Sequence, residues 1–182
     1  MDMLIKSNVD KKKVIILGGN GFIGKNLSKC FYKHGLDVYS LDIREPDEEL
    51  EGINYISGDF FDEIFLKEII SDKDIIFHAI STIQPGNSNQ KYMSGYNRDM
   101  IESIRLFSYL LGTKKKLIFL SSGGTVYGNQ KIQPIKEDVM ALPINHYGNV
   151  KLCIENTMRV FNTQMHSKML IARISNPYGP GQ

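Results

Sequence analysis

A tyrosine and a lysine four positions apart, Tyr147 and Lys151, have the residue types and spacing for acid–base chemistry on an alcohol. On a helix, this spacing puts both side chains on one face. The lysine ammonium would favour the phenolate form of the tyrosine, and the charge of an oxidised nicotinamide would favour it further. A phenol whose ordinary pKa is about 10 would then act as a base near neutral pH. Such a pair can take the proton of a hydroxyl group while hydride leaves the same carbon for a nicotinamide.

The same spacing occurs in a second pair, Tyr127 and Lys131, and the sequence context separates the two. Tyr127 is followed by a Gly-Asn pair and then by Pro134, a composition typical of a loop, in which residues four apart do not meet. Tyr147 instead opens a sustained amphipathic stretch. We therefore interpret Tyr147 and Lys151 as the functional pair, and a surface helix pair without function is the alternative.

A glycine-rich segment, Gly18-Gly19-Asn20-Gly21-Phe22-Ile23-Gly24, follows a short apolar run and has the form of a phosphate-binding turn. Gly18, Gly21 and Gly24 suit a tight turn, close approach of the backbone to a pyrophosphate, and tight packing of a helix on a strand. The N-terminus of the following helix would attract the phosphates. The motif is weak alone, but its position between a strand and a helix strengthens it. We therefore predict that this segment, including Phe22 and Ile23, contacts a dinucleotide.

Asp42 lies at the end of the next predicted strand, where a carboxylate can bind the adenosine ribose. It would accept hydrogen bonds from the ribose hydroxyls and repel a 2′-phosphate, which favours NAD over NADP. Arg44 weakens this preference, because a guanidinium two residues on could bind that phosphate. A solvated strand-end residue is the alternative for Asp42.

Short apolar runs alternate with longer amphipathic stretches, which predicts an α/β fold: a doubly wound parallel sheet of about six strands with helices on both faces. The expected strands are 14–17, 38–43, 54–56, 75–80, 117–121 and 169–174, and the expected helices are 23–35, 64–70, 97–111 and 147–166. Residues 1–10 form a lead-in, and 11–182 form one domain. The long loops 82–93 and 123–145 follow strand ends, where ligands of open α/β sheets bind.

Composition excludes several classes of protein. The 182 residues are 42% hydrophobic and 23% charged, unlike a disordered or low-complexity chain. A net charge of +2 is too balanced to indicate a nucleic-acid partner, and no apolar run approaches the roughly 20 residues of a membrane helix. Two cysteines cannot build a disulfide framework, so we expect a cytoplasmic protein. No metal is expected, because the His and Cys residues lack ligand spacing.

Taken in order from Val14 to Gln182, these segments resemble the extended short-chain dehydrogenase/reductase family, in particular its NAD-dependent epimerase/dehydratase branch, which acts on sugar nucleotides. The resemblance implies a Rossmann-like fold with NAD, and less readily NADP, as cofactor. Further cofactor contacts implied by matching segments are Asp59, Phe60, Ala79, Ile80, Asn97 and Ser121. Implied substrate contacts are Ser122, Gly123 and Asn176.

By the same resemblance, Tyr147 is the base, while Lys151 lowers its pKa and holds the nicotinamide ribose. The implied reaction is that of a UDP-hexose 4-epimerase, which oxidises the C4 hydroxyl to a ketone and returns hydride to the other face. A reductase or a non-catalytic dinucleotide-binding module is the alternative. A 4,6-dehydratase would need an Asp-Glu pair where Gly124-Thr125 stands. Family members also suggest a homodimer and a role in polysaccharide biosynthesis.

Three departures from the family pattern affect these expectations. Leu17 stands where many members have Thr, which removes a side-chain hydrogen bond. Gly123 stands where the family places a Ser or Thr that contacts the reacting hydroxyl, so Thr125, Ser122 or a water would replace it, and Thr125 is our choice as a catalytic residue. Members also continue into a C-terminal region that covers the substrate. We expect that region to be absent here, leaving a fragment that binds dinucleotide but turns over sugar poorly.

Overall fold

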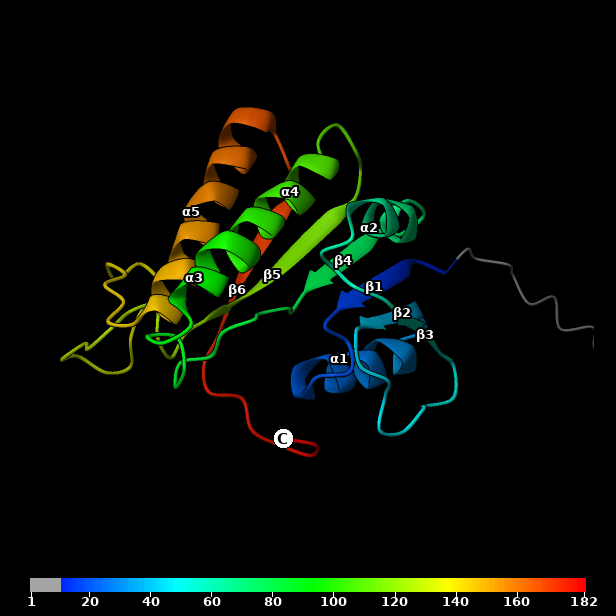
Figure 1. Cartoon of the computed structure of the whole chain (residues 1–182), viewed down its shortest axis with the longest axis horizontal. Coiled ribbons are helices and arrows are strands. Elements are labelled where there is room, and N and C mark those ends of the chain that lie inside the picture. The colour runs from blue at the N-terminus through cyan, green and yellow to red at the C-terminus, as the bar shows by residue number, and fades with distance from the viewer. Residues whose placement is uncertain (1–10) are drawn as a thin grey trace, which may run out of the picture.

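A single sheet of six parallel strands forms the centre of the molecule in a computed structural model that describes residues 11–182 (Figure 1). The strand order is β3-β2-β1-β4-β5-β6. The strands are β1 (Lys13–Leu17), β2 (Asp37–Asp42), β3 (Ile53–Ser57), β4 (Ile75–His78), β5 (Lys116–Ser122) and β6 (Met169–Ile174). This order confirms the predicted doubly wound fold. The predicted lead-in, residues 1–10, lies outside the described residues.

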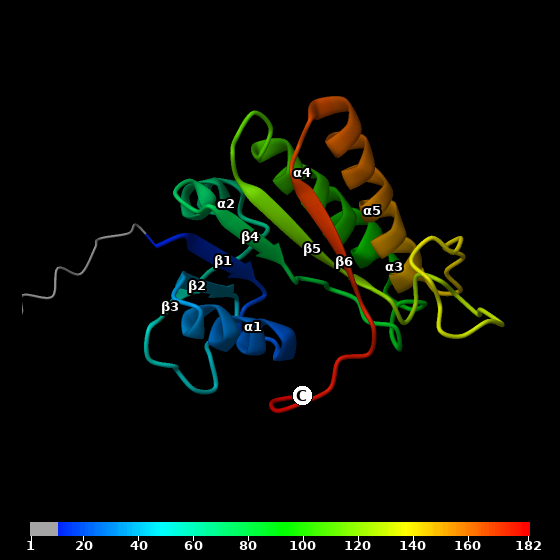
Figure 2. The same ribbon diagram turned by 180° about the vertical axis from the view of Figure 1, so that it is seen from behind.

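Helices cover both faces of the sheet. They are α1 (Phe22–Lys33), α2 (Glu63–Ile70), α3 (Tyr92–Ser94), the π-helical segment η1 (Gly95–Met100), α4 (Ile101–Tyr109) and α5 (His146–Met165). Helix α1 lies on one face, whereas α2, α4 and α5 lie on the other, as the two opposite views show (Figures 1 and 2). The chain therefore changes face between β3 and β4, as right-handed crossovers in a doubly wound sheet require.

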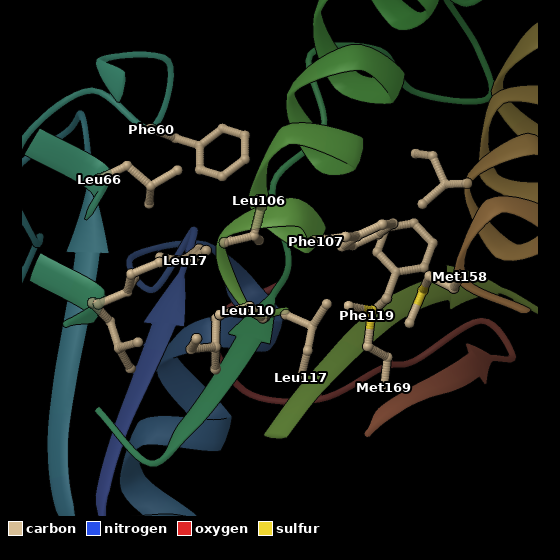
Figure 3. Packing of buried hydrophobic residues seen from close by; sticks show 14 of the residues in the cluster. Leu17, Phe60, Leu66, Leu106, Phe107, Leu110, Leu117, Phe119, Met158 and Met169 are labelled. Carbon is tan, nitrogen blue, oxygen red and sulfur yellow. The ribbon is translucent and has the colours of Figure 1, made fainter. Parts of the chain in front are cut away.

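The core follows from the alternation of side chains along the strands. Val14 and Ile16 of β1 face the α1 side, whereas Ile15 and Leu17 face the α2, α4 and α5 side. All four are fully buried, which explains why β1 is continuously apolar rather than alternating. On the larger side, Figure 3 shows side chains of α4, such as Phe107, lying among those of the strands.

The pairing register brings the site together at one edge of the sheet. Leu17 pairs with Leu41 of β2 on one side and with His78 of β4 on the other. The residues that follow, Gly18, Asp42 and Ala79, therefore emerge side by side at the carboxyl edge. Strands β2 and β4 lie on opposite sides of β1, so the order in which strands are added to the sheet reverses at β1. Open α/β sheets bind ligands at such a switch point.

Most predicted element ends differ from the structure by one or two residues, and two differences affect the site. The strand predicted to run to Ile80 ends at His78. The helix predicted to begin at Asn97 begins at Tyr92, with the short α3 before the π-helical stretch η1. Gly95 makes this earlier start feasible, because a Cβ there would lie 2.4 Å from the Ile83 side chain. The helix therefore packs against the loop after β4 more closely than any larger residue would permit.

Among residues 11–182, none of the helices has the length and apolar character needed to cross a membrane. The same described part of the chain has no cluster of three or more His, Cys, Asp or Glu side chains arranged to hold a metal ion.

Candidate active site

The glycine turn after β1 is held tightly by its neighbours. The N–H groups of Gly18 and Gly19 both donate to the carbonyl oxygen of Leu41, at 2.8 and 2.9 Å. Gly18 has a φ of +85°, which favours glycine. A Cβ on Gly24 would lie 2.5 Å from the carbonyl oxygens of Gly18 and Gly19, so the first turn of α1 rests directly on the turn. No side chain caps the N-terminus of α1, which leaves its backbone N–H groups for an anion.

A cleft of about 440 Å³ opens at this edge of the sheet. Predicted cofactor residues that line it are Gly18, Gly21, Asp42, Asp59, Phe60, Ala79 and Ile80. Further lining residues, for which the sequence predicted no contact, include Ser81, Thr82, Gln84 and Arg98. Predicted residues outside this lining are Phe22, Ile23, Gly24, Asn97, Ser121, Tyr147 and Lys151. The signal for Thr82 and Gln84 was the long loop 82–93, which was expected to border a site, whereas no sequence signal pointed to Ser81 or to Arg98 in η1.

Asp42 lies in the wall of this cleft and is only 8% exposed. One carboxylate oxygen accepts a hydrogen bond from the N–H of Asn20 at 3.2 Å, and the other accepts one from the N–H of Arg44 at 3.1 Å. The guanidinium of Arg44 is exposed, with Nε 3.7 Å from the same carboxylate. Asp42 is thus a fixed group facing the cleft rather than a freely solvated strand end.

The Tyr147 and Lys151 pair lies on the first turns of α5. Asn145 caps this helix, since its side-chain oxygen accepts from the N–H of Gly148 at 2.8 Å. Lys151 is 4% exposed, and its Nζ donates to the carbonyl oxygen of Leu120 at 3.1 Å. That Nζ lies 5.6 Å from the centre of the Tyr147 ring. The predicted helical pairing is therefore present, with the lysine anchored to the end of β5.

Burial dominates the electrostatics of the pair. Burial lowers the pKa of Lys151 to about 8, and the Asp99 carboxylate partly opposes this. Burial also raises the pKa of the Tyr147 phenol, and Asp99 raises it further. The pKa of Tyr147 is thus raised, and not lowered as the sequence predicted from the neighbouring Lys151. A further positive charge beside the phenol is needed to make it a base near neutral pH.

Asp99, in the π-helical segment η1, is a site residue that the sequence patterns did not identify. Its carboxylate is buried and accepts hydrogen bonds from the N–H of Thr82 at 2.9 Å and from the hydroxyl of Ser81 at 2.8 Å. Asn97, which was predicted to serve the site, is exposed. The family resemblance pointed to Asn97 in this segment, whereas the π-helical turn places Asp99 inward.

The turn after β5 carries the predicted substrate contacts. The Thr125 hydroxyl donates to the Ser122 hydroxyl at 2.9 Å, which places the two candidate replacements for the missing Ser or Thr side by side. A Cβ on Gly123 would lie 3.1 Å from the Ser175 hydroxyl and 3.3 Å from a backbone oxygen of β6. Gly123 therefore lets the turn pack closely against the end of β6, a position with little room for a side chain.

Ser121 and Asn176, which were predicted to contact the cofactor and the substrate, each contact other parts of the protein. The Ser121 hydroxyl, predicted to contact the cofactor, donates to the buried carboxylate of Glu155 at 2.6 Å. Asn176 is exposed and lies against Gly124, where a Cβ would be 2.6 Å from its side-chain oxygen. The segment after β6 then runs toward α1 (Figure 2), where Asn26 donates to the carbonyl oxygen of Pro180 at 3.1 Å.

The second tyrosine of the sequence pattern, Tyr127, has a different environment from Tyr147. It lies in the turn after β5 and is buried beneath the Arg173 guanidinium, 4.7 Å from the ring centre. Lys131 is exposed. The described structure thus gives Tyr127 a packing position outside any helix, as the loop composition predicted.

Comparison with known proteins places the chain in a family. The NAD dependent epimerase/dehydratase family matches residues 14–182. The curated relatives include dTDP-4-dehydro-6-deoxyglucose reductase of Escherichia coli, 32% identical over 94% of this chain and 58% of its own length. UDP-glucose 4-epimerase of Yersinia enterocolitica is 30% identical over 91% of this chain and 54% of its own length.

Solved structures of other proteins have the same fold as this chain. A UDP-glucose 4-epimerase of Thermotoga maritima, solved with UDP-glucose, superposes with a TM-score of 0.84 at 26% identity, covering 93% of this chain and 57% of that one. The UDP-glucose 4-epimerase of Thermus thermophilus, solved in complex with NAD, gives a TM-score of 0.85 at 22% identity over the same shares, which is a likeness of fold. The chain thus spans little more than half the length of the relatives that it matches.

Proposed function

Because the chain belongs to the NAD-dependent epimerase/dehydratase family, we propose that it forms the cofactor-binding part of a UDP-hexose 4-epimerase. One observation carries the proposal. The Tyr147 and Lys151 pair is anchored at the end of β5, on the same carboxyl edge of the sheet as the cleft after β1, β2 and β4. A base and a dinucleotide site at one edge suit hydride transfer from an alcohol.

The residues of the cleft fit NAD. The turn from Gly18 to Gly24, including Phe22 and Ile23, would hold the diphosphate, since no side chain caps the N–H groups at the start of α1. Asp42 would bind the adenosine ribose, and Asp59 with Phe60 would border the adenine. Ala79 and Ile80 would form the wall beside the ring system. Bound NAD would accept hydride from the sugar and return it.

In this proposal, the chain's own residues handle the proton and the substrate. Tyr147 takes the proton of the C4 hydroxyl. Lys151 keeps its bond to Leu120 and offers its remaining N–H groups to the nicotinamide ribose. Thr125, with Ser122 beside it, binds the reacting hydroxyl in place of the side chain that Gly123 lacks.

Three predicted contacts have weaker support. Asn176 would contact the substrate diphosphate, and its place beside the turn after β5 is compatible with that role. Asn97 and Ser121 were predicted to contact the cofactor. Asn97 is exposed, and the Ser121 hydroxyl is bonded to Glu155. Both residues are therefore better placed to stabilise the surrounding structure than to contact the cofactor.

A sugar-nucleotide reductase is the second candidate function. The 32% identity with the Escherichia coli reductase supports it, and the same cleft and base would serve. A dehydratase has less support, because Gly124-Thr125 offers no carboxylate for proton transfer at C5 and C6.

We also propose a homodimer and a cytoplasmic location, with a role in supplying sugars for polysaccharide biosynthesis. The outer faces of α4 and α5 expose apolar side chains, including Ile101 and Val160, which would suit a partner helix. Cys30 and Cys153 are both free, as in a reducing compartment.

A substrate assay separates the candidate functions. The chain, extended at its C-terminus to the length of its relatives, is incubated with UDP-glucose and a catalytic amount of NAD, and this protein is called the extended form below. We expect UDP-galactose to accumulate with no net change in NADH. Stoichiometric consumption of NADH with a 4-keto sugar nucleotide would favour the reductase. Binding of NAD without turnover of either substrate would favour the non-catalytic module.

A further inference from the structure

A buried amide, Asn20, lies between the glycine turn and the end of β2 and has no part in the proposed chemistry. Only 9% of the residue is exposed, although it lies within the glycine motif at the edge of the cleft. A buried side-chain amide is costly unless its donors and acceptors are satisfied. Its contacts therefore indicate what it stabilises.

The hydrogen bonds of Asn20 reach β2 or the residues just after it. The Ser40 hydroxyl donates to the side-chain oxygen of Asn20 at 2.8 Å. The side-chain Nδ2 donates to the carbonyl oxygen of Arg44 at 2.7 Å. The backbone N–H donates to the Asp42 carboxylate at 3.2 Å. One residue thus joins the phosphate turn to the strand end on which Asp42 stands.

These bonds fix Asp42 from two sides. One carboxylate oxygen is held by the N–H of Asn20 and the other by the N–H of Arg44, and Asn20 also holds the carbonyl oxygen of Arg44. The turn approaches β2 very closely, since a Cβ on Gly19 would lie 2.1 Å from the Ser40 hydroxyl. The path of residues 42–44 therefore depends on the Asn20 side chain.

We propose that Asn20 is a positioning residue that sets the preference for NAD over NADP. Its side chain fixes the Arg44 backbone, whose N–H group in turn holds the Asp42 carboxylate in the wall of the cleft. The inference rests on the proposed placement of the adenosine ribose at Asp42. A 2′-phosphate would require that carboxylate to withdraw and the Arg44 guanidinium to approach. The guanidinium is exposed, belongs to a residue that lines the cleft and lies 3.7 Å from the Asp42 carboxylate, so release of its backbone would leave it free to approach.

Titration calorimetry with NAD and with NADP tests the inference on the intact chain, in wild type, Asn20→Ala and Ser40→Ala. In Asn20→Ala, we expect the affinity for NAD to fall about tenfold and the affinity for NADP to stay level or rise, because the tie to Arg44 is lost. Ser40→Ala is the matched control. It removes the bond to the Asn20 oxygen but leaves the bond to Arg44, so the ratio of the two affinities should be retained.

Two further variants make the result decisive. Asn20→Ser is too short to reach the Arg44 carbonyl oxygen and should reproduce the change in ratio if the alanine variant fails to fold. Adding Arg44→Ala to Asn20→Ala should abolish any gain in NADP binding. An unchanged ratio in a folded Asn20 variant would overturn the inference, even if both affinities fall. Failure of the wild type to bind either dinucleotide would instead overturn the proposed function, and this inference with it.

Discussion

The Tyr147→Phe variant is expected to lower turnover of UDP-glucose by about 100- to 10,000-fold, the range typical for loss of a general acid–base. The substitution removes only the hydroxyl that would accept the substrate proton. The ring keeps its packing beside the core, so the affinity for NAD should change little. The measurement is kcat for UDP-glucose in the extended form, together with calorimetry of NAD binding on the same variant.

Tyr127→Phe is the matched control for this prediction. It makes the same chemical change in the other tyrosine that precedes a lysine by four residues, but Tyr127 is buried beneath Arg173 in a turn. We expect kcat to stay within about threefold of wild type, since packing residues act on stability more than on the chemical step. Comparable turnover by Tyr147→Phe and wild type would show that the base has been misassigned.

Glu155→Ala is expected to produce the largest loss of stability, about 3–5 kcal/mol, as for removal of one partner of a buried ion pair. Glu155 lies on α5, is 0% exposed and contacts β5 and β6 through Ser121 and Arg173. Its carboxylate accepts from Arg173 at 2.7 and 3.0 Å and from the Ser121 hydroxyl at 2.6 Å. The variant would leave the guanidinium of Arg173, itself little exposed, without its charge partner. Urea denaturation measures the effect.

A matched control for Glu155→Ala lies on the same carboxylate. Arg159 also donates to Glu155, at 2.9 Å, but its side chain is 48% exposed. Arg159→Ala should therefore cost less than about 1 kcal/mol. If Glu155→Ala also lowered the free energy of unfolding by less than about 1 kcal/mol, the buried network would stabilise the fold no more than a surface ion pair does.

The network also predicts sensitivity to acid. Burial disfavours the charged form of Glu155, but hydrogen bonds from Arg173 and Ser121, with the nearby arginine charges, outweigh it and lower the carboxyl pKa below its ordinary 4.5. The stabilisation is thus present above about pH 4.5 and is lost as the pH falls through the lower folded-state pKa. In Glu155→Gln, this part of the acid dependence should disappear.

Local patterns predicted the parts of the site that depend on neighbours in the sequence. The glycine spacing requires only a strand, a turn and a helix in succession, so Gly18 and Gly21 were found at the cleft. Helical periodicity sufficed to place Tyr147 and Lys151 on one face, and the loop composition around Tyr127 excluded the second pair. The alternation of elements predicted the sheet.

The missed residues depend on contacts between distant segments. The role of Asn20 is set by Ser40 on β2 and by Arg44 just after it, and that of Glu155 by Arg173 on β6. Sequence spacing carries no sign of such pairs. Asp99 was missed for a different reason, since the family resemblance pointed to Asn97, whereas the π-helical segment buries Asp99.

The central claim is that a dinucleotide lies across the carboxyl edge of the sheet, from Asp42 past Gly18 toward Tyr147. A crystal structure of the chain grown with NAD tests it most directly. We expect the adenosine ribose within hydrogen-bond distance of Asp42, the diphosphate over the turn at Gly18 to Gly21, and the nicotinamide beside Tyr147. A dinucleotide bound elsewhere, or bound in this cleft with its nicotinamide turned away from Tyr147, would contradict the claim.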